Sequence, residues 1–169
     1  LLKAAVRDDK PVMIFEHKLL YGSKGARAES GAVDATSEIP DEDYTVPLDT
    51  AAVCREGADV TILAWLLMRH FAVVAAQQLA AEGVSAEVID VRSLVPLDTR
   101  TILESVTRTG RLFTVEENPR LCGWGAEVAS IAAEECLWDL DGPIVRITTP
   151  HIPLPSAANL EDLAIPSVE

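Results

Sequence analysis

The stretch from residue 60 to residue 91, VTILAWLLMRHFAVVAAQQLAAEGVSAEVIDV, decides the fold class of this 169-residue chain. It opens with the apolar run 60–64, which is typical of a buried strand, and it closes with a second strand-like run at 86–91. Between the two runs, apolar side chains recur at helical spacing until Gly83, which ends the helix. A strand, a helix and a strand in this order predict a right-handed crossover between parallel strands.

The alternation of helices and strands continues toward the C-terminus. The sequence predicts a helix from its N-cap at Asp98 to Gly110, and a strand at 111–115 follows. A further helix is expected near Ala126 to Leu137, before a strand at 143–147. This order predicts an α/β fold with a mainly parallel sheet and helices on both faces.

The first third of the chain has a different character. Residues 11–16, PVMIFE, predict a buried strand that follows the end of an amphipathic helix. From Gly22 to Pro47 the residues are mostly Gly, Ser, Ala, Asp and Glu, so this part is expected to be a linker or a long surface loop. The missing initiator Met and the opening in a helical pattern suggest a fragment. Residues 159–169 contain the start of another helix.

Composition excludes several classes of function. The chain has 27 acidic and 14 basic side chains and a net charge of −13, which argues against binding of nucleic acid and favours a basic partner. No apolar run reaches the ~18 residues of a membrane-spanning helix, and no signal peptide is visible. The three cysteines lack C-x-x-C spacing, so we expect reduced thiols rather than disulfides or a zinc site.

Known phosphate-binding motifs are absent. The turn after the first strand of the regular region, residues 64–68, contains no glycine, so Asp90 is not expected to be part of a ribose-binding pair. The segment 123–125, Gly-Trp-Gly, lacks the third glycine of the dinucleotide fingerprint, which favours a tight turn with Trp124 packed nearby. No Walker-type phosphate loop occurs either.

Candidate acid-base residues are few. The three histidines, His17, His70 and His151, lack the spacing of metal ligands, and His17 is the best candidate for a role because it follows a predicted strand. Glu116 and Glu117 also end a strand. Since no nucleophile elbow or cofactor cradle accompanies them, a capping or interface role is favoured. The residues alone therefore predict a noncatalytic α/β module.

Several segments together resemble one family, the β subunits of thiamine-diphosphate-dependent 2-oxo acid dehydrogenases, which include the pyruvate, branched-chain and acetoin dehydrogenases. The resemblance covers nearly the whole chain, and Asp90 to Asp98, DVRSLVPLD, is its most specific part. The segments that carry it are PVMIFEHKLLY at 11–21, YTVPL at 44–48, VIDVRSLVPLD at 88–98, ENPR at 117–120 and CGWGAE at 122–127.

The resemblance implies a domain organisation. Residues 1–21 would be the remnant of a pyrimidine-binding domain, 22–50 the interdomain linker, and 51–169 a transketolase C-terminal domain. That domain implies a three-layer α/β/α fold with a mainly parallel sheet of about five strands, one of them antiparallel. After the strand at 60–64 this chain has the bulky Trp65, where many relatives have small or polar residues, and this disfavours a small-molecule regulatory site.

The resemblance also implies the chemistry and where it resides. The complete enzyme would decarboxylate a 2-oxo acid and pass the acyl group to lipoyl, using thiamine diphosphate and magnesium. The cofactor and metal would be held by the α subunit, and the activating glutamate would lie upstream of Leu1. We therefore expect no catalytic, cofactor-binding or metal-binding residue in this chain, which should be inactive alone. A stand-alone ligand-binding or adaptor domain remains an alternative. So does the C-terminal domain of a transketolase or deoxyxylulose-phosphate synthase.

The expected partners follow from the same resemblance. They are a second β subunit, the α subunit, and the basic peripheral subunit-binding domain of the acyltransferase core, in the bacterial cytoplasm or an organelle matrix. No nucleic acid or membrane is expected. Four carboxylates after the Gly-Trp-Gly segment are the candidate docking residues, with a solvated acidic face as the alternative: Glu134, Glu135, Asp139 and Asp141.

Overall fold

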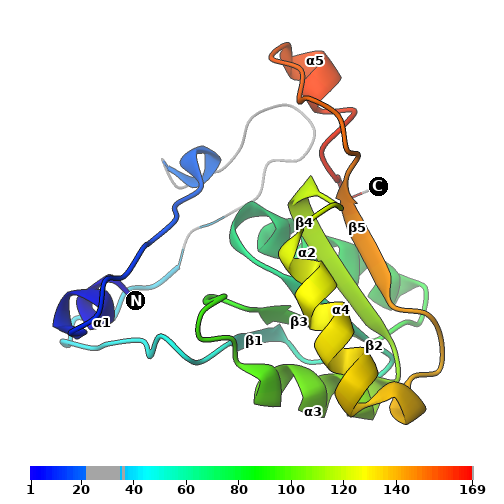
Figure 1. Ribbon diagram of the computed structural model, residues 1–169, viewed down its shortest axis with the longest axis horizontal. Helices are drawn as coiled ribbons and strands as arrows, with labels where there is room; N and C mark the ends of the chain where they lie inside the picture. The colour runs from blue at the N-terminus through cyan, green and yellow to red at the C-terminus, as the bar shows by residue number, and fades with distance from the viewer. Residues whose placement is uncertain (22–34, 36, 169) are drawn as a thin grey trace.

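The computed structural model describes residues 1–21, 35 and 37–168, and the strands in this part form one five-stranded sheet (Figure 1). The strand order is β1-β3-β2-β4-β5, with β1 antiparallel to β3 and all other neighbours parallel. The strands are β1 (Ala52–Arg55), β2 (Val60–Ala64), β3 (Ala86–Asp90), β4 (Leu112–Pro119) and β5 (Val145–Thr149). The expected α/β sheet with one antiparallel strand is confirmed.

Helices cover both faces of this sheet. The long helix α2 (Leu66–Ala81) packs on one face, and α3 (Thr99–Thr109) and α4 (Trp124–Glu135) pack on the other. Figure 1 shows α4 in front of the sheet and α2 behind it. The expected three layers are therefore present. The shorter helices are α1 (Leu2–Arg7), η1 (Lys18–Leu20), η2 (Leu137–Asp139) and α5 (Ala158–Glu161).

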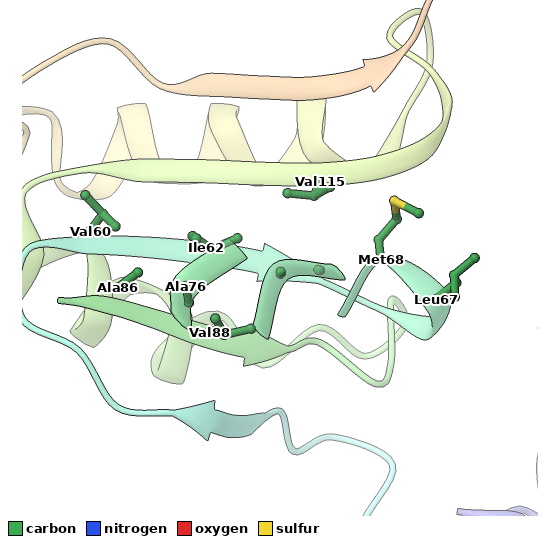
Figure 2. Close-up of a cluster of buried hydrophobic side chains, with 10 residues drawn as sticks. Val60, Ile62, Leu67, Met68, Ala76, Ala86, Val88 and Val115 are labelled. Carbon is green, nitrogen blue, oxygen red and sulfur yellow. The ribbon is translucent and has the colours of Figure 1, made fainter. Parts of the chain in front are cut away.

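The central strand β2 is buried along its whole length, and its side chains alternate between two cores. Val60 and Ile62 face the core under α2, where Ala76 lets the helix approach closely (Figure 2). Leu63 points the other way, into a second core that includes Val106 of α3. Because side chains on both faces of the sheet are buried here, the sequence of β2 is a nearly continuous hydrophobic run, as is typical of strands in buried parallel sheets.

The predicted ends of α3 are confirmed. The Asp98 carboxylate accepts hydrogen bonds from the Thr101 amide at 3.1 Å and the Thr101 hydroxyl at 2.7 Å. It also accepts one from the amide of Ala51 at 3.0 Å, so the residue before β1 is tied to the start of α3. At the other end, Gly110 adopts a φ of +67° and closes the helix.

The expected strand at 11–16 is wrong. These residues form irregular chain, and Met13 and Phe15 are 82% and 65% exposed. A strand needs neighbouring backbone to satisfy its N–H and C=O groups, and no described strand lies beside this segment. The helix before it, α1, has no buried residue. The expected linker falls largely on 22–34 and 36, outside the described residues.

Other differences concern the ends of elements. β4 runs to Pro119, four residues beyond the expected end, and α4 begins at Trp124, two residues early. β5 begins two residues after the expected start at 143. The short strand β1 was not predicted from residue pattern, because it has only four residues and no buried one. No helix in the described part of the chain is long and apolar enough to cross a membrane.

The Asp98 cap gives a prediction for stability and its pH dependence. Burial raises the pKa of this carboxyl, but hydrogen bonds from Thr101 and Ala51 outweigh burial, so the pKa lies below its ordinary value. Asp98→Ala should lower the free energy of unfolding by about 1 to 2 kcal/mol, because three donors lose their acceptor. Asp98→Asn keeps an acceptor and should cost less.

The carboxylate's contribution should be fully present above the unfolded pKa of about 3.9 and be lost as pH falls toward the lower folded value. Asp98→Asn has no carboxylate to titrate, so its stability should approach that of the original chain in acid. Urea unfolding between about pH 7 and about pH 3 measures this convergence. If the free energies of unfolding of Asp98→Asn and the original chain differ by the same amount at every pH, the assigned pKa shift is contradicted.

Candidate functional site

The crevice between the carboxyl ends of β2 and β4 is where a sheet of this topology binds ligands, because α2 and α4 leave on opposite faces. Here two tryptophans meet at this place. The rings of Trp65, after β2, and Trp124, at the start of α4, contact edge to face with centroids 6.3 Å apart. Bulky rings, rather than the small residues that a dinucleotide requires, therefore line the crevice.

A carboxylate lies buried at the start of α4. Glu116 of β4 has no solvent exposure, and its Oε2 accepts a hydrogen bond from Asn118 Nδ2 at 2.9 Å. Its Oε1 lies 3.5 Å from Nη2 of Arg146, on the neighbouring strand β5. The same Arg146 nitrogen donates to the carbonyl of Arg120 at 2.7 Å. The ion pair thus joins β4, β5 and the loop before α4.

The two glycines at the start of α4 are required by this carboxylate. A Cβ at Gly125 would lie 2.4 Å from both Glu116 Oε1 and Thr114 Oγ1. A Cβ at Gly123 would lie 2.5 Å from Glu116 Oε2. Helix N-termini attract anions through their free N–H groups and dipole. Here the chain's own carboxylate lies at the N-terminus of α4, so the place where a phosphate would bind is already filled.

Hydrogen bonding around this ion pair is incomplete. Four buried polar atoms make no hydrogen bond within the described residues: Thr114 Oγ1, Glu116 Oε1, Trp124 Nε1 and Arg146 Nε. An ion pair in such surroundings depends on both partners, because removing one leaves a buried charge that nothing compensates. Removing either Glu116 or Arg146 should therefore be costly.

His17 lies at the same edge and contacts the second glutamate of β4. Its Nε2 is 2.9 and 3.1 Å from the two carboxylate oxygens of Glu117. Its Nδ1 accepts a hydrogen bond from the amide of Leu19 at 3.2 Å, so a neutral ring carries its proton on Nε2 and donates it to Glu117. Leu19 and Leu20 pack against the core under α2. His17 therefore fastens the N-terminal segment to the sheet, and neither nitrogen is free to act as a base.

The remaining candidates have structural partners. Asp90 accepts a hydrogen bond from the Arg92 amide at 3.1 Å and lies 3.7 Å from Nε of Arg69, so it fixes the turn after β3. Burial is the main cause that raises the pKa values of Cys54 and Cys136, which keeps both thiols protonated. All three cysteines are free, and the described residues contain no cluster of side chains that could hold a metal ion.

The four candidate docking carboxylates lie on adjacent segments, at the end of α4, on η2 and in the turn after it. We call Glu134, Glu135, Asp139 and Asp141 the acidic surface; all four are exposed, and none has a Lys or Arg partner within 4.0 Å among the described residues. Beside them Trp138 is 94% exposed. Residue pattern did not single out Trp138 or Arg146 as functional, and it marked Asn118 only as part of the ENPR segment at 117–120.

Comparison with known proteins places the chain among a group of relatives. It matches the family described as "Transketolase, C-terminal domain" over residues 49–169. It is 46% identical over 169 residues to the "Pyruvate dehydrogenase E1 component subunit beta-2, mitochondrial" of Oryza sativa subsp. japonica, covering 100% of this chain and 43% of that protein. It is 43% identical over 162 residues to the "2-oxoisovalerate dehydrogenase subunit beta" of Bacillus subtilis (strain 168), covering 95% and 46%.

A solved structure agrees with this placement. The "Split gene transketolase, inactive beta4 tetramer" superposes with a TM-score of 0.65 at 30% identity, covering 80% of this chain and 43% of the other. The chain thus spans less than half the length of each of these relatives.

The buried carboxylate gives a prediction for Gly125. Gly125→Ala should lower the free energy of unfolding by about 1 to 3 kcal/mol, because the new methyl group overlaps Glu116 and Thr114. Gly142→Ala is the matched control, since its Cβ would meet nothing within 4 Å, and it should change stability by less than about 0.5 kcal/mol. Chemical denaturation measures both losses of stability. Equal losses would show that Gly125 is not needed to make room for the Glu116 carboxylate.

Proposed function

Because this chain belongs to the transketolase C-terminal domain family, we propose that it is the C-terminal, noncatalytic assembly part of the β subunit of a 2-oxo acid dehydrogenase decarboxylating component. The observation that carries the proposal is the 46% identity to a pyruvate dehydrogenase β subunit along the whole chain. The complete component would decarboxylate a 2-oxo acid and transfer the acyl group to lipoyl, in the bacterial cytoplasm or an organelle matrix.

The cofactor of that reaction, thiamine diphosphate with magnesium, does not fit the described part of this chain. The N-terminus of α4 is filled by Glu116, whose negative charge would repel a diphosphate. The described residues also contain no cluster of metal-ligating side chains. In this proposal the cofactor and its metal are held elsewhere in the enzyme, and this part contributes no residue to the chemical step.

Since this proposal places the cofactor elsewhere in the enzyme, the role proposed for this part is assembly. We propose that the domain pairs with a second β subunit and supports the α subunit. A related solved structure is itself described as a β tetramer, which supports the expectation of β-to-β pairing. That relative is a transketolase, and the C-terminal domain of a transketolase is the alternative function. The dehydrogenase assignment is favoured because this chain is 46% identical to the pyruvate dehydrogenase β subunit and 30% identical to the solved transketolase.

The acidic surface is the proposed dock for the basic peripheral subunit-binding domain of the acyltransferase core. Its four carboxylates have no basic partner within the described part of the chain, so their charge is available to another molecule. The exposed Trp138 beside them adds an aromatic anchor of the kind that often dominates protein interfaces. Complementary charge would steer association and make affinity fall with salt.

Charge reversal tests this dock. The double variant Glu135→Lys and Asp139→Lys should weaken binding of a cognate basic subunit-binding domain about tenfold or more at low salt, and reduce the dependence of affinity on salt. Glu82→Lys with Glu127→Lys is the control, because it makes the same change in charge on exposed positions outside the acidic surface. Calorimetry at two ionic strengths measures affinity, and equal losses in both double variants would place the dock elsewhere.

A further inference from the structure

The outermost parallel strand of the sheet, β5, has an unpaired edge. Its inner edge pairs with β4, and no strand in the described part of the chain lies along its outer edge (Figure 1). Apart from the bonds of the sheet itself, no backbone hydrogen bond involves residues 145–149 among those described. The backbone N–H and C=O groups of this outer edge are therefore available to another strand.

This edge lacks common features that keep edge strands from pairing. Proteins often protect an edge strand with a proline, a lysine or a bulge. The sequence of β5, VRITT, contains neither proline nor lysine, and its register with β4 is regular from Val145 to Thr148. Valine, isoleucine and threonine also favour extended backbone. The edge of β5 is therefore well suited to pairing.

Two apolar side chains of β5 lie beside this edge. Val145 pairs with Phe113 and Ile147 with Val115, so both point to the side of the sheet that carries α2. They remain 37% and 42% exposed, since α2 packs on β2, β3 and β4. An apolar cavity of about 320 Å³ between Ile147 and α2 adjoins them. A further strand along β5 would extend this apolar face and cover part of both side chains.

Charge makes β5 a surface at which two copies of this chain can meet. Each copy has a net charge of −13, so two copies repel each other wherever carboxylates come together. Residues 142–160 contain no aspartate or glutamate. The one charged residue of β5, Arg146, is turned toward Glu116, and its side chain is only 12% exposed. Two copies can therefore approach along β5 without direct repulsion between carboxylates.

The sequence of β5 also suits antiparallel pairing with itself. With Ile147 on a two-fold axis, it would face the partner's Ile147, while Arg146 would face the partner's Thr148 and Val145 the partner's Thr149. No like charges then lie opposite each other, and two apolar side chains meet at the centre. An isologous contact of this kind uses the same surface twice, so one free strand edge per copy is enough.

Antiparallel pairing would keep the two acidic surfaces apart. The acidic surface precedes β5 in the chain, so the two acidic surfaces would lie toward opposite ends of the paired strands. The starts of the two strands would be roughly 13 Å apart at about 3.3 Å per residue, which exceeds the Debye length of about 8 Å at physiological ionic strength. The contact is therefore compatible with the proposed dock.

We propose that β5 is a contact surface between two copies of this chain, which pair antiparallel along it and extend the sheet across a two-fold axis. This inference rests on the proposed pairing of β subunits and names the surface that carries it. Two short strands should bury less than the roughly 1,200 Å² of ordinary specific interfaces, so the isolated chain should form a weak dimer with a dissociation constant of about 0.1 to 1 mM.

A dilution series of the ¹⁵N-labelled chain tests the contact without any substitution. Sedimentation between about 0.02 and about 1 mM should show the average mass rising toward that of a dimer. Over the same range, amide signals that shift with concentration should centre on residues 144–149. These shifts locate the contact in the folded chain, because they do not depend on the stability of a variant.

A charge on the proposed axis gives the second test. Ile147→Lys should weaken dimerisation about tenfold or more, because two lysines would meet there. The substitution also makes the chain less negative, so relief of general repulsion alone would strengthen association instead. Val53→Lys is the matched control, since Val53 is 46% exposed on β1, the other edge strand, and it should change affinity less than about twofold.

The remaining outcomes separate this contact from the proposed function. A dimer whose concentration-dependent shifts lie elsewhere, or one that Ile147→Lys and Val53→Lys weaken equally, would overturn the β5 contact and leave the pairing of β subunits standing. A chain that stays monomeric to about 1 mM would contradict both the contact and the self-pairing of the domain. If Ile147→Lys does not fold, the dilution shifts of the unchanged chain decide the question.

Discussion

The ion pair between Glu116 and Arg146 is the constraint on which the carboxyl edge of the sheet depends. Burying a charged pair costs several kcal/mol of desolvation per ion, so the surrounding chain must compensate. Asn118 and the Arg146 contact to the loop supply part of that compensation, while Glu116 Oε1 and Arg146 Nε make no hydrogen bond within the described residues. A Cβ at 123 or 125 would come within 2.5 Å of a Glu116 oxygen, so a larger residue there would have to displace this carboxylate.

This constraint also leaves no room for a phosphate at the carboxyl edge of the sheet, which supports the proposed assembly role. A doubly wound sheet usually binds its ligand at a helix N-terminus beside the switch point. Here Glu116 occupies the N-terminus, and the rings of Trp65 and Trp124 fill the crevice. His17 and Glu117 use the rest of the edge to hold the N-terminal segment. The acidic surface, by contrast, is exposed.

Sequence reasoning succeeded where the determinants are local. The N-cap at Asp98 and the left-handed Gly110 were predictable, since each acts within a few residues of the chain. The strand at 11–16 was wrong because a strand depends on neighbours that sequence pattern does not reveal. The burial of Glu116 was missed for the same reason, since its partner Arg146 lies 30 residues away. The available signals were Arg146 inside the predicted strand at 143–147 and Glu116 directly after the predicted strand at 111–115.

The central proposal, that this chain supplies assembly and not cofactor chemistry, is tested most directly by titration with thiamine diphosphate and magnesium. Isothermal calorimetry of the chain should give no saturable heat, and the amide signals of residues 123–126 should not shift, because Glu116 already fills the start of α4. Saturable binding with a dissociation constant in the low micromolar range, about −8 kcal/mol, would contradict the account.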